Sequence, residues 1–509
     1  MSSPATLASS NSDQKSVHFN FANTYARLPQ RFYSRVDPTP VPAPRLVKIN
    51  VELARKLGLD PEALASPEGV EILAGNRVAE GSEPLAMAYA GHQFGHFVPQ
   101  LGDGRANLIG EVFGKDGLRY DIQLKGSGPS AFSRRGDGRA ALGPVLREYI
   151  VSEAMAAMGV PTTRALAAVT TGEEVFRESI LPGAVLTRVA ASHLRVGTFQ
   201  YFAAKGDTEG IQTLADYAIS RHYPDAAQSE KPYRALLDGV IARHAHLIAQ
   251  WMLLGFIHGV MNTDNTSISG ETIDYGPCAF MEAYDPAKVF SSIDHRGRYA
   301  YGNQPHAAHW NLTRLAETLL PLLQKEEGGE EAATASAWAA LENFGPKFEA
   351  VQAAGLRRKL GLFTERKGDA ALAQDLMDRM AIDRADFTLT FRRLSDAVAG
   401  PGGEAGVRTL FADPGSFDTW AIAWRNRLKE EDVPAQERAA SMRLANPAFI
   451  PRNHRVEAVI SAAVLRQDFQ PFEELLAVVS QPYEDRRQFE QYAMPALPEE
   501  CVSQTFCGT

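Results

Sequence analysis

Cysteine is scarce in this chain, with three residues among 509. So few cysteines do not supply the disulfide framework of a small secreted scaffold. Long hydrophobic runs are missing as well. The longest apolar stretch, from about Leu247 to Val260, is interrupted by Gln250 and His258. It is shorter than the roughly 20 residues that a membrane helix needs, so it predicts a buried helix instead.

Positive charge is also in deficit, because 52 Lys and Arg residues stand against 61 Asp and Glu residues, a formal net charge of −9. Dedicated nucleic-acid binders usually carry a basic face, so no nucleic-acid partner is expected. The opening stretch MSSPATLASSNSDQKS has neither the apolar core of a secretory signal nor the arginines of a transit peptide. We therefore expect a cytoplasmic monomer with no membrane partner.

The remaining composition, 45% hydrophobic and 22% charged, is that of a globular protein large enough for two or three units. Four prolines between residues 36 and 45 predict an extended segment, and INVELARKLG predicts a helix that Gly58 ends. We predict an α+β fold in five parts: a disordered stretch over 1–16, an extension over 17–100, a β-containing lobe over 101–185, a larger helical lobe over 186–490 that includes a loop at 258–280, and a cysteine-containing tail over 491–509.

Two strands are predicted in the smaller lobe, at Ala106–Phe113 and Leu118–Lys125, joined by a glycine-rich turn. In the second strand, apolar residues alternate with Asp121, Gln123 and Lys125. Successive side chains of a strand point to opposite faces, so Lys125 points away from the apolar layer.

A helix is predicted next, over Pro144–Met158, because apolar residues recur at helical spacing and Gly159 follows them. Glu148 lies in the middle of this helix, beside the apolar stripe. From about residue 310 onwards the pattern is mostly helical. The chain thus places a small β-containing region before a large helical one.

The densest group of polar residues is HGVMNTDNTSISGETIDYGPCAF, residues 258–280. It predicts a loop, a short strand and a second loop that carry Asp264, Asn265 and Asp274. Oxygen ligands of this kind suit a hard cation such as Mg²⁺, which keeps several waters and adds substrate phosphates.

The protein-kinase pattern H-R-D-x-x-x-x-N followed by D-F-G can be laid over this segment. With His258 on the kinase histidine, Asn265 falls on the metal-binding asparagine and Asp274 begins D-Y-G. The position of the kinase base is Val260, which cannot accept a proton. The nearby carboxylate is Asp264, so the metal arrangement is kept while the usual base is missing.

Other kinase parts have counterparts here. Lys125 resembles the phosphate-pairing lysine, and Glu148 on the following helix resembles its partner. The run GDGR at residues 102–105 offers backbone N–H groups to a phosphate. Arg188 and Arg195 add two cations. A full G-x-G-x-x-G and an A-P-E are missing, so an ordinary protein kinase is a poor match.

Two histidines in AGHQFGHF, His92 and His96, have the spacing of a zinc pair on a helix. No third ligand lies nearby in the sequence. Packing or hydrogen bonding is therefore the preferred interpretation, and neither histidine is assigned to the site.

Several long strings resemble the selenoprotein O family of protein adenylyltransferases: AGHQFGHF, LGDGRA, QLKGSGPSAFSRRGDGRAALGPVLREYIVSEAM, GVMNTDN and DYGPCAF. The similarity spans roughly residues 18–320 strongly. It implies a protein-kinase-like bilobal fold in which ATP binds in a reversed orientation and presents its α-phosphate. It also implies transfer of AMP to Ser, Thr or Tyr hydroxyls of proteins.

The resemblance implies a role for each matching residue. Asp264 is the base, Asn265 and Asp274 hold Mg²⁺ or Mn²⁺, and Glu148 positions Lys125. The residues implied to contact ATP are Gly102, Gly104, Arg105, Lys125, Asp137, Gly138, Arg188, Arg195 and Asp274.

Cys278 follows D-Y-G directly, and Cys501 and Cys507 lie near the end of the chain. The resemblance implies a redox-responsive disulfide between Cys278 and one of the two. The ending CVSQTFCGT departs from the usual family ending and leaves the partner open.

Three alternative functions also stay open: UMP transfer, kinase-type transfer of the γ-phosphate, and a nucleotide-binding pseudokinase scaffold without catalysis. The targets, the acceptor residue type and the preferred metal are not specified by the sequence.

Overall fold

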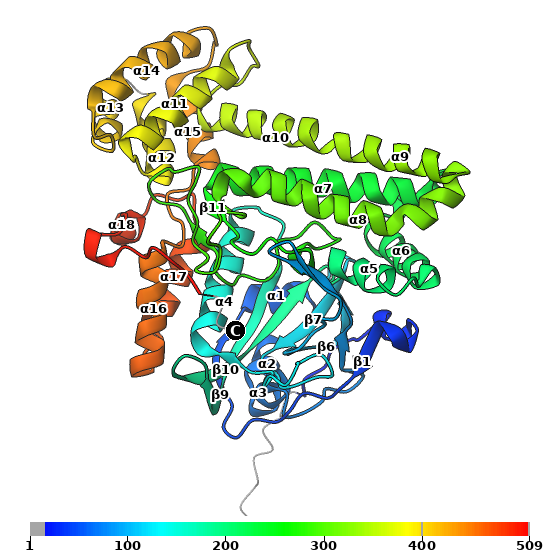
Figure 1. Ribbon diagram of the computed structural model, residues 1–509. Coiled ribbons are helices and arrows are strands. Elements are labelled where there is room, and N and C mark those ends of the chain that lie inside the picture. The colour runs from blue at the N-terminus through cyan, green and yellow to red at the C-terminus, as the bar shows by residue number, and fades with distance from the viewer. Residues whose placement is uncertain (1–15, 399–400, 507–509) are drawn as a thin grey trace, which may run out of the picture.

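The computed structural model describes residues 16–398 and 401–506 and contains both helices and strands (Figure 1). The stretch expected to be disordered lies, up to residue 15, outside the described residues. One antiparallel sheet forms the lower part of the molecule in Figure 1, and long helices lie above it. The α+β composition is thereby confirmed.

The sheet has eight strands in the order β1-β3-β6-β7-β10-β9-β2, with β8 paired to β10. The pairings between these strands are all antiparallel in the described part of the chain. The strand bounds are β1 Tyr33–Arg35, β2 Arg45–Ile49, β3 Leu85–Met87, β6 Ala106–Phe113, β7 Arg119–Lys125, β8 Ala140–Ala141, β9 Arg164–Phe176 and β10 Ile180–Ala190.

The β6–β7 hairpin confirms the two predicted strands, although β7 begins one residue later than expected. Ala106 pairs with Lys125, and Gly117 turns the chain with a φ of 76°, which favours glycine. Ile122 and Leu124 pack into an apolar cluster on one side of the sheet. Lys125 therefore points to the opposite side, as predicted.

The strands come from both sides of residue 100, because β1, β2 and β3 precede it in the chain. Between them lie the short helices α1 Val51–Lys56, α2 Pro61–Ala65 and α3 Pro67–Ala74. Asn50 caps α1 by accepting from the Leu53 N–H, and Gly58 follows in the left-handed region. The predicted division of the chain at residue 100 stays a prediction.

Helix α4, Leu142–Ala157, crosses one face of the sheet and contacts β9 and β10. It starts two residues before the predicted helix, and Gly159 follows its end at a φ of 81°. Glu148 is buried in the middle of α4 although it is charged. A buried carboxylate requires a partner, and the functional site supplies it.

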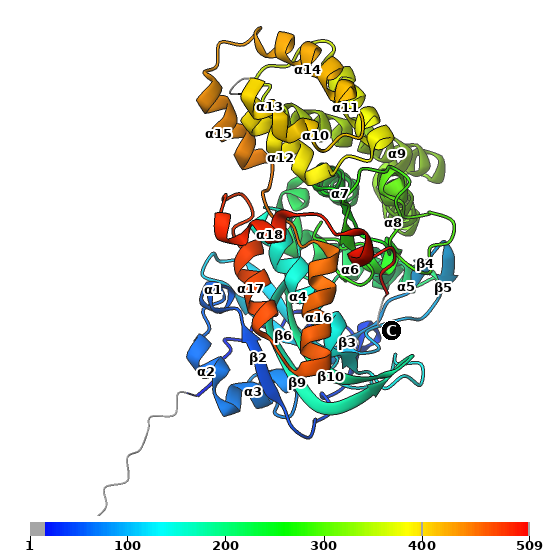
Figure 2. The same ribbon diagram turned by 90° about the vertical axis from the view of Figure 1, so that its left-hand side faces the viewer.

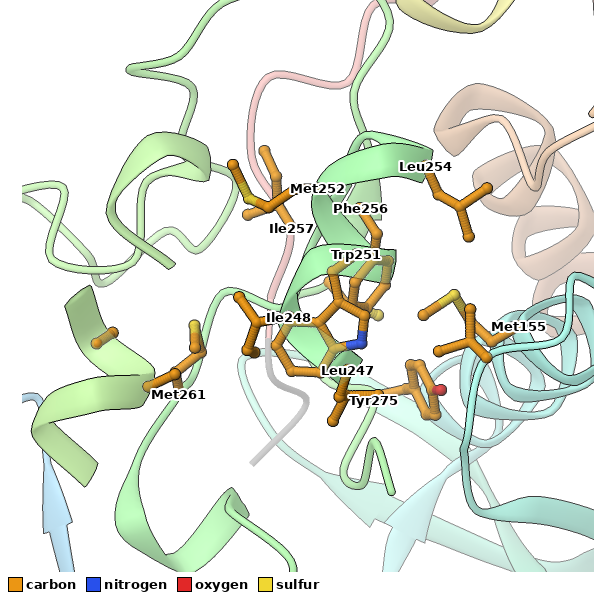
Figure 3. Close-up of a cluster of buried hydrophobic side chains, with 14 of the residues drawn as sticks. Met155, Leu247, Ile248, Trp251, Met252, Leu254, Phe256, Ile257, Met261 and Tyr275 are labelled. Atoms are coloured by element: carbon orange, nitrogen blue, oxygen red, sulfur yellow. The ribbon is translucent and has the colours of Figure 1, made fainter. Parts of the chain in front are cut away.

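Helix α7, Pro232–Leu254, holds most of the longest apolar stretch. The prediction of one helix through Val260 is wrong beyond Leu254, because Gly255 turns the chain with a φ of 70°. Strand β11, Phe256–Ile257, follows and pairs with β12, Ala279–Phe280. Figure 3 shows Trp251, Phe256 and Tyr275 in the buried cluster around this turn. The polar segment between β11 and β12 is thus flanked by side chains of this buried apolar cluster.

The rest of the chain is mostly helical, as predicted. In Figure 2, α11 to α15 gather at the top, while α16 and α17 lie beside α4. Their bounds, with those of the other helices, are α5 Val196–Ala203, α6 Thr208–His222, α8 Gln304–Glu327, α9 Glu330–Glu342, α10 Phe344–Lys359, α11 Asp369–Asp383, α12 Phe387–Ala397, α13 Pro401–Arg408, α14 Pro414–Leu428, α15 Ala435–Ala445, α16 Asn453–Arg466, α17 Gln470–Val479 and α18 Glu490–Ala493. Among the described residues, no helix combines the length and apolarity of a membrane span.

The end of the chain returns to the segment that follows β12. Thr505 pairs with Ser291 in a parallel bridge, and its N–H donates to the Phe290 carbonyl oxygen at 2.8 Å. The Thr505 hydroxyl donates to the Pro277 carbonyl oxygen at 2.6 Å. The last described residues are therefore fixed against residues 277–292.

Candidate active site

The segment 258–280 is a loop held between β11 and β12, with one 3₁₀ turn at Thr263–Asn265. The prediction of a short strand within this loop is wrong, because no strand lies between β11 and β12 in the described chain. Two isolated bridges take its place, Arg195 with Ser267 and Thr162 with Thr272. The backbone of this loop therefore pairs with distant segments of the chain and not with itself.

His258 anchors the start of this loop. Its Nε2 bonds the Ile273 carbonyl oxygen at 2.8 Å, and its ring stacks on Trp251 with 5.3 Å between centroids. Burial lowers the pKa of His258, so the imidazole is neutral and donates this bond. The Ile273 carbonyl directly precedes Asp274, so His258 links the two halves of the loop.

Asp264 lies in the 3₁₀ turn and is buried. Its Oδ2 accepts from the Gln93 side-chain amide at 3.2 Å, and its Oδ1 has no hydrogen-bond partner in the described part of the chain. Burial raises the pKa of Asp264 to about 6. One carboxylate oxygen of Asp264 is therefore held and the other is buried without a hydrogen-bond partner among the described residues, and the raised pKa suits a base near neutral pH.

Asn265 follows Asp264, and its side-chain N–H₂ donates to the Val260 carbonyl oxygen at 3.0 Å. This bond fixes the orientation of the amide, so the amide oxygen points away from Val260. Val260 itself is buried and offers no proton acceptor on its side chain.

Four charged side chains meet beside this loop. Lys125 Nζ donates to Glu148 at 2.5 Å and lies 3.5 Å from Asp274 Oδ1. Arg188 donates to both carboxylates, at 2.8 Å to Glu148 and 2.6 Å to Asp274. Lys125, Glu148, Arg188 and Asp274 form what we call the ion-pair cluster.

The cluster is closed on one side and open on the other. Glu148 and Arg188 are 2% and 3% exposed, whereas the side chains of Lys125 and Asp274 are 12% and 24% exposed. Burial opposes the charge of Asp274, but Arg188, Lys125 and Arg195 outweigh it and lower its pKa well below its usual range. Asp274 has a φ of 61°, an uncommon conformation for a residue other than glycine. Asp274 is therefore a fixed anion at the mouth of the cluster.

Arg195 connects the cluster to the loop. Its guanidinium donates to the Asp264 carbonyl oxygen at 3.1 Å and lies 3.7 Å from Asp274 Oδ2. Asp103 lies 3.9 Å away, and the Tyr89 ring stacks on the guanidinium at 4.3 Å. Arg195 is the residue that holds both predicted acidic groups in one place.

The glycine-rich run 102–105 passes over Phe132. A Cβ at Gly102 would lie 2.2 Å from the Phe132 ring, and one at Gly104 would lie 2.8 Å from the Phe132 carbonyl oxygen. Ser130 donates to the Asp103 carbonyl oxygen at 2.6 Å, and the Ser133 hydroxyl donates to the Gly104 carbonyl oxygen. Both glycines are thus required by close packing of two loops. Arg105 is half-buried at the end of this run.

Gly138 shares this packing, because a Cβ on it would lie 2.1 Å from the Gly128 carbonyl carbon. Asp137 is different. Its carboxylate pairs with Arg177 at 2.8 Å and is 44% exposed. The hydrogen bond from Arg177 outweighs the opposing effect of burial and lowers the pKa of Asp137.

The sequence missed several residues of this region. Gln93 and Tyr89 reach Asp264 and Arg195 from a segment more than 160 and 100 residues earlier in the chain. Gln123 donates to Asp103 at 3.3 Å and accepts from Arg188 at 3.3 Å. Alternation on β7 placed Gln123 on the face of Lys125, which was the one available signal. The long-range contacts left no local pattern.

The donor set at the mouth of the cluster is compatible with a hard divalent cation. Asp274 offers a partly exposed carboxylate and Asn265 an oriented amide oxygen, while Asp264 Oδ1 has no partner in the described residues. No group of three His, Cys, Asp or Glu side chains among the described residues is arranged to hold a metal by itself. Two protein oxygens supplemented by phosphates and water are the usual pattern for Mg²⁺.

Comparison with known proteins identifies the family. Residues 15–480 match the family described as "Protein adenylyltransferase SelO". The chain is 67% identical over 493 residues to a protein of a Bradyrhizobium species, covering 97% of this chain and all of that relative. It is 66% identical over 497 residues to a protein of Methylorubrum extorquens, covering 96% and 99%. Both relatives are named "Protein nucleotidyltransferase YdiU". On this similarity the chain belongs to the SelO family.

Proposed function

We propose that this chain is a metal-dependent protein adenylyltransferase, which transfers AMP from ATP to Ser, Thr or Tyr hydroxyls of proteins. The proposal rests above all on one observation. Arg195 contacts both Asp264 and Asp274 of the ion-pair cluster, while the position of a kinase base holds the buried Val260. Membership of the SelO family and the names of the relatives support nucleotidyl transfer.

The kinase-like bilobal fold belongs to the same proposal. Lys125 at the end of β7 and Glu148 in α4 form a strand-to-helix ion pair of the kind that kinases use. Asp274 reaches Lys125 from the segment after the loop, as the D-F-G aspartate does. These contacts favour ATP between the sheet and the helices.

In the proposed reaction, Asp264 accepts the proton of the acceptor hydroxyl. The hydroxyl oxygen forms a bond to the α-phosphorus, and the bond from that phosphorus to the oxygen bridging to the β-phosphate breaks. Pyrophosphate leaves and AMP stays on the acceptor. The cations Lys125, Arg188 and Arg195 stabilise the phosphate charge, and fixed charges of this kind contribute most of such catalysis.

The other predicted contacts complete the proposed ATP site. The N–H groups of Gly102 and Gly104 lie in a loop that close packing on Phe132 holds in place. Arg105, Asp137 and Gly138 are assigned to the nucleotide on the resemblance alone. The reversed orientation of ATP is assigned in the same way.

Asn265 and Asp274 would hold the divalent cation, Mg²⁺ or Mn²⁺. Such an ion supplies charge neutralisation on the phosphates and on the leaving pyrophosphate. Asp274 is prepared for this role because Arg188 and Lys125 keep it ionised.

The decisive experiment uses ATP labelled separately at the α- and γ-phosphorus, with Asp264→Ala as control. Adenylylation predicts label on protein from the α position only, and none with Asp264→Ala. Label from the γ position alone would identify a kinase. Nucleotide binding without any covalent label would identify a scaffold. UTP competing better than ATP would identify UMP transfer.

We also propose the redox disulfide between Cys278 and a tail cysteine. Cys278 is buried directly after Pro277, to which Thr505 donates, and Thr505 is two residues before Cys507 in the sequence. This favours Cys507, which lies outside the described residues, over Cys501, which is exposed beside a cavity of about 590 Å³. Peptide mapping of the oxidised protein tests it, and a map without any cross-linked Cys278 peptide would refute it.

A further inference from the structure

A two-stranded hairpin lies directly against the loop that carries Asp264. Its strands are β4, Gly91–Gln93, and β5, His96–Val98, and Gln93 stands opposite His96. The hairpin is separate from the large sheet. It therefore does not extend that sheet.

A closed ring of hydrogen bonds fixes the hairpin to the loop and to α5. The His92 N–H donates to Thr263 Oγ1 at 2.7 Å, and the Thr263 hydroxyl donates to Gln200 Oε1 at 2.6 Å. The Gln200 side-chain amide bonds His92 Nδ1 at 2.8 Å, which closes the ring. The Phe94 N–H donates to Asn262 Oδ1 at 3.1 Å. The two residues before Asp264 are thus held by the hairpin.

The hairpin also approaches Asp264 itself as closely as a backbone can. A Cβ at Gly91 would lie 2.3 Å from Asp264 Oδ1, so a side chain there would displace the carboxylate. Phe94 has a φ of 51°, and its ring contacts Tyr299 with 5.1 Å between centroids. A non-glycine residue in this region is strained and requires support from its surroundings. The packing of Gly91 and the conformation of Phe94 therefore fix the position of the hairpin turn relative to Asp264.

From this hairpin, the Gln93 side chain reaches the Asp264 carboxylate. Its amide donates to Asp264 Oδ2 at 3.2 Å. A neutral amide holds a carboxylate without neutralising its charge, unlike a lysine or an arginine. Asp264 Oδ1 keeps no partner in the described residues. One carboxylate oxygen is thus held by Gln93, and the other is enclosed beside Gly91.

We infer that Gln93 is a positioning residue, which holds the Asp264 carboxylate in the orientation that meets the acceptor hydroxyl. This inference rests on the proposed function of Asp264 as the base. Among the described residues, the Gln93 side chain has a hydrogen bond to Asp264 and none to Lys125 or Arg188. Its loss therefore affects the acceptor step and spares nucleotide binding.

The test measures AMP transfer from α-labelled ATP to α-casein and to the chain itself, together with pyrophosphate release and ATP affinity. Gln93→Ala is expected to lower kcat about tenfold, the effect of one hydrogen bond to a charged group, with the Kd for ATP changed by less than about twofold. Gln93→Glu keeps the size but places a second carboxylate beside Asp264, so kcat falls at least as far. Pyrophosphate released per AMP transferred rises in both variants, because water competes with a poorly oriented acceptor.

His96→Ala is the matched control, since His96 is exposed on the same hairpin opposite Gln93. It is expected to keep wild-type kcat, Kd and Tm. The inference is overturned if both Gln93 variants keep kcat within about twofold, or if Gln93→Ala lowers Tm and ATP affinity more than His96→Ala does.

Asp264→Ala separates this inference from the proposed function. An active Asp264→Ala variant refutes the base itself. An inactive Asp264→Ala beside fully active Gln93 variants refutes only the positioning role. The double variant is expected to be no slower than Asp264→Ala, because Gln93 acts through Asp264.

Discussion

One face of strand β7 supports two charged networks, and they differ in enclosure. At one end, Asp121 pairs with Arg221 at 2.5 Å, and Arg221 also pairs with Glu111 at 2.9 Å. At the other end, Lys125 pairs with Glu148 and Asp274 in the ion-pair cluster. Both networks contain arginine and two carboxylates, so residue type does not distinguish them.

The Asp121 network is closed. Its three side chains are at most 6% exposed, and Glu111 also accepts from the backbone N–H groups of Thr24 and Tyr25. The ion-pair cluster leaves Lys125 and Asp274 partly exposed. A closed network can contribute only to the fold, whereas an open one retains capacity for a ligand. Four substitutions test this difference.

The largest effect is expected at the open end. Asp274→Asn removes the charge that faces Lys125 and Arg188 and a proposed metal ligand, so AMP transfer should fall about 10³-fold. Initial rates with α-labelled ATP measure it. Asp285→Asn, on the same segment but exposed, is the control. More than a tenth of wild-type transfer in Asp274→Asn would contradict an open, ligand-handling cluster.

The closed end should respond in stability instead. Arg221→Ala leaves Asp121 and Glu111 buried without their shared cation, which costs about 3–5 kcal/mol of folding free energy. Denaturant titration measures the loss, and the rate per folded molecule should stay unchanged. Arg119→Ala removes a cation 3.6 Å from Glu111 that is 21% exposed, and should cost only about 1 kcal/mol. Equal costs for the two variants would show that enclosure is not the cause.

A third effect concerns pH. Burial raises the pKa of Glu271, which accepts from Ser269 and the Ala191 N–H, to about 7. The folded state then binds this proton more tightly than the unfolded state, so stability falls as pH rises from about 4.5 to about 7. Glu271→Gln should be more stable than wild type by about 2 kcal/mol at pH 8 and equal to it near pH 4.

Thermal unfolding at both pH values measures this difference, with Glu174→Gln as a surface control for the lost charge. A Glu271→Gln variant with the same thermal stability as wild type at pH 8 would show that burial does not raise the pKa of Glu271.

The smallest effect on stability is expected at the exposed pair. Asp137→Ala removes the partner of Arg177, and such a surface pair contributes about 0–1 kcal/mol. If Asp137 also contacts ATP, as the resemblance implies, the KM for ATP should rise several-fold while Tm stays constant. Arg177→Ala serves as the comparison. An unchanged KM in Asp137→Ala would remove Asp137 from the ATP site.

Sequence reasoning located what local patterns determine. The alternation in β7 gave the direction of Lys125, and helical spacing gave α4 and the position of Glu148 beside its apolar stripe. The structure brings Lys125, Glu148, Arg188 and Asp274 together, although their roles remain predictions. The direction of Lys125 and the position of Glu148 on α4 depend on neighbours within a few residues.

What the sequence did not reveal depends on contacts between distant segments. AGHQFGHF was interpreted through its histidines, yet Gln93 is the residue that reaches Asp264. The apolar run through Val260 predicts one buried helix, but Gly255 divides it into α7 and β11. A hydrophobic period does not show where a chain turns to make a long-range pair.

The docking of Thr505 on Pro277 and Ser291 has a consequence for biosynthesis. The segment after Asp274 obtains these backbone partners from a residue 228 positions after Pro277 in the chain. A nascent chain that has not yet reached Thr505 lacks them, although its sheet and its loop at 258–280 are already synthesised. The order of synthesis therefore delays completion of this segment until Thr505 has emerged.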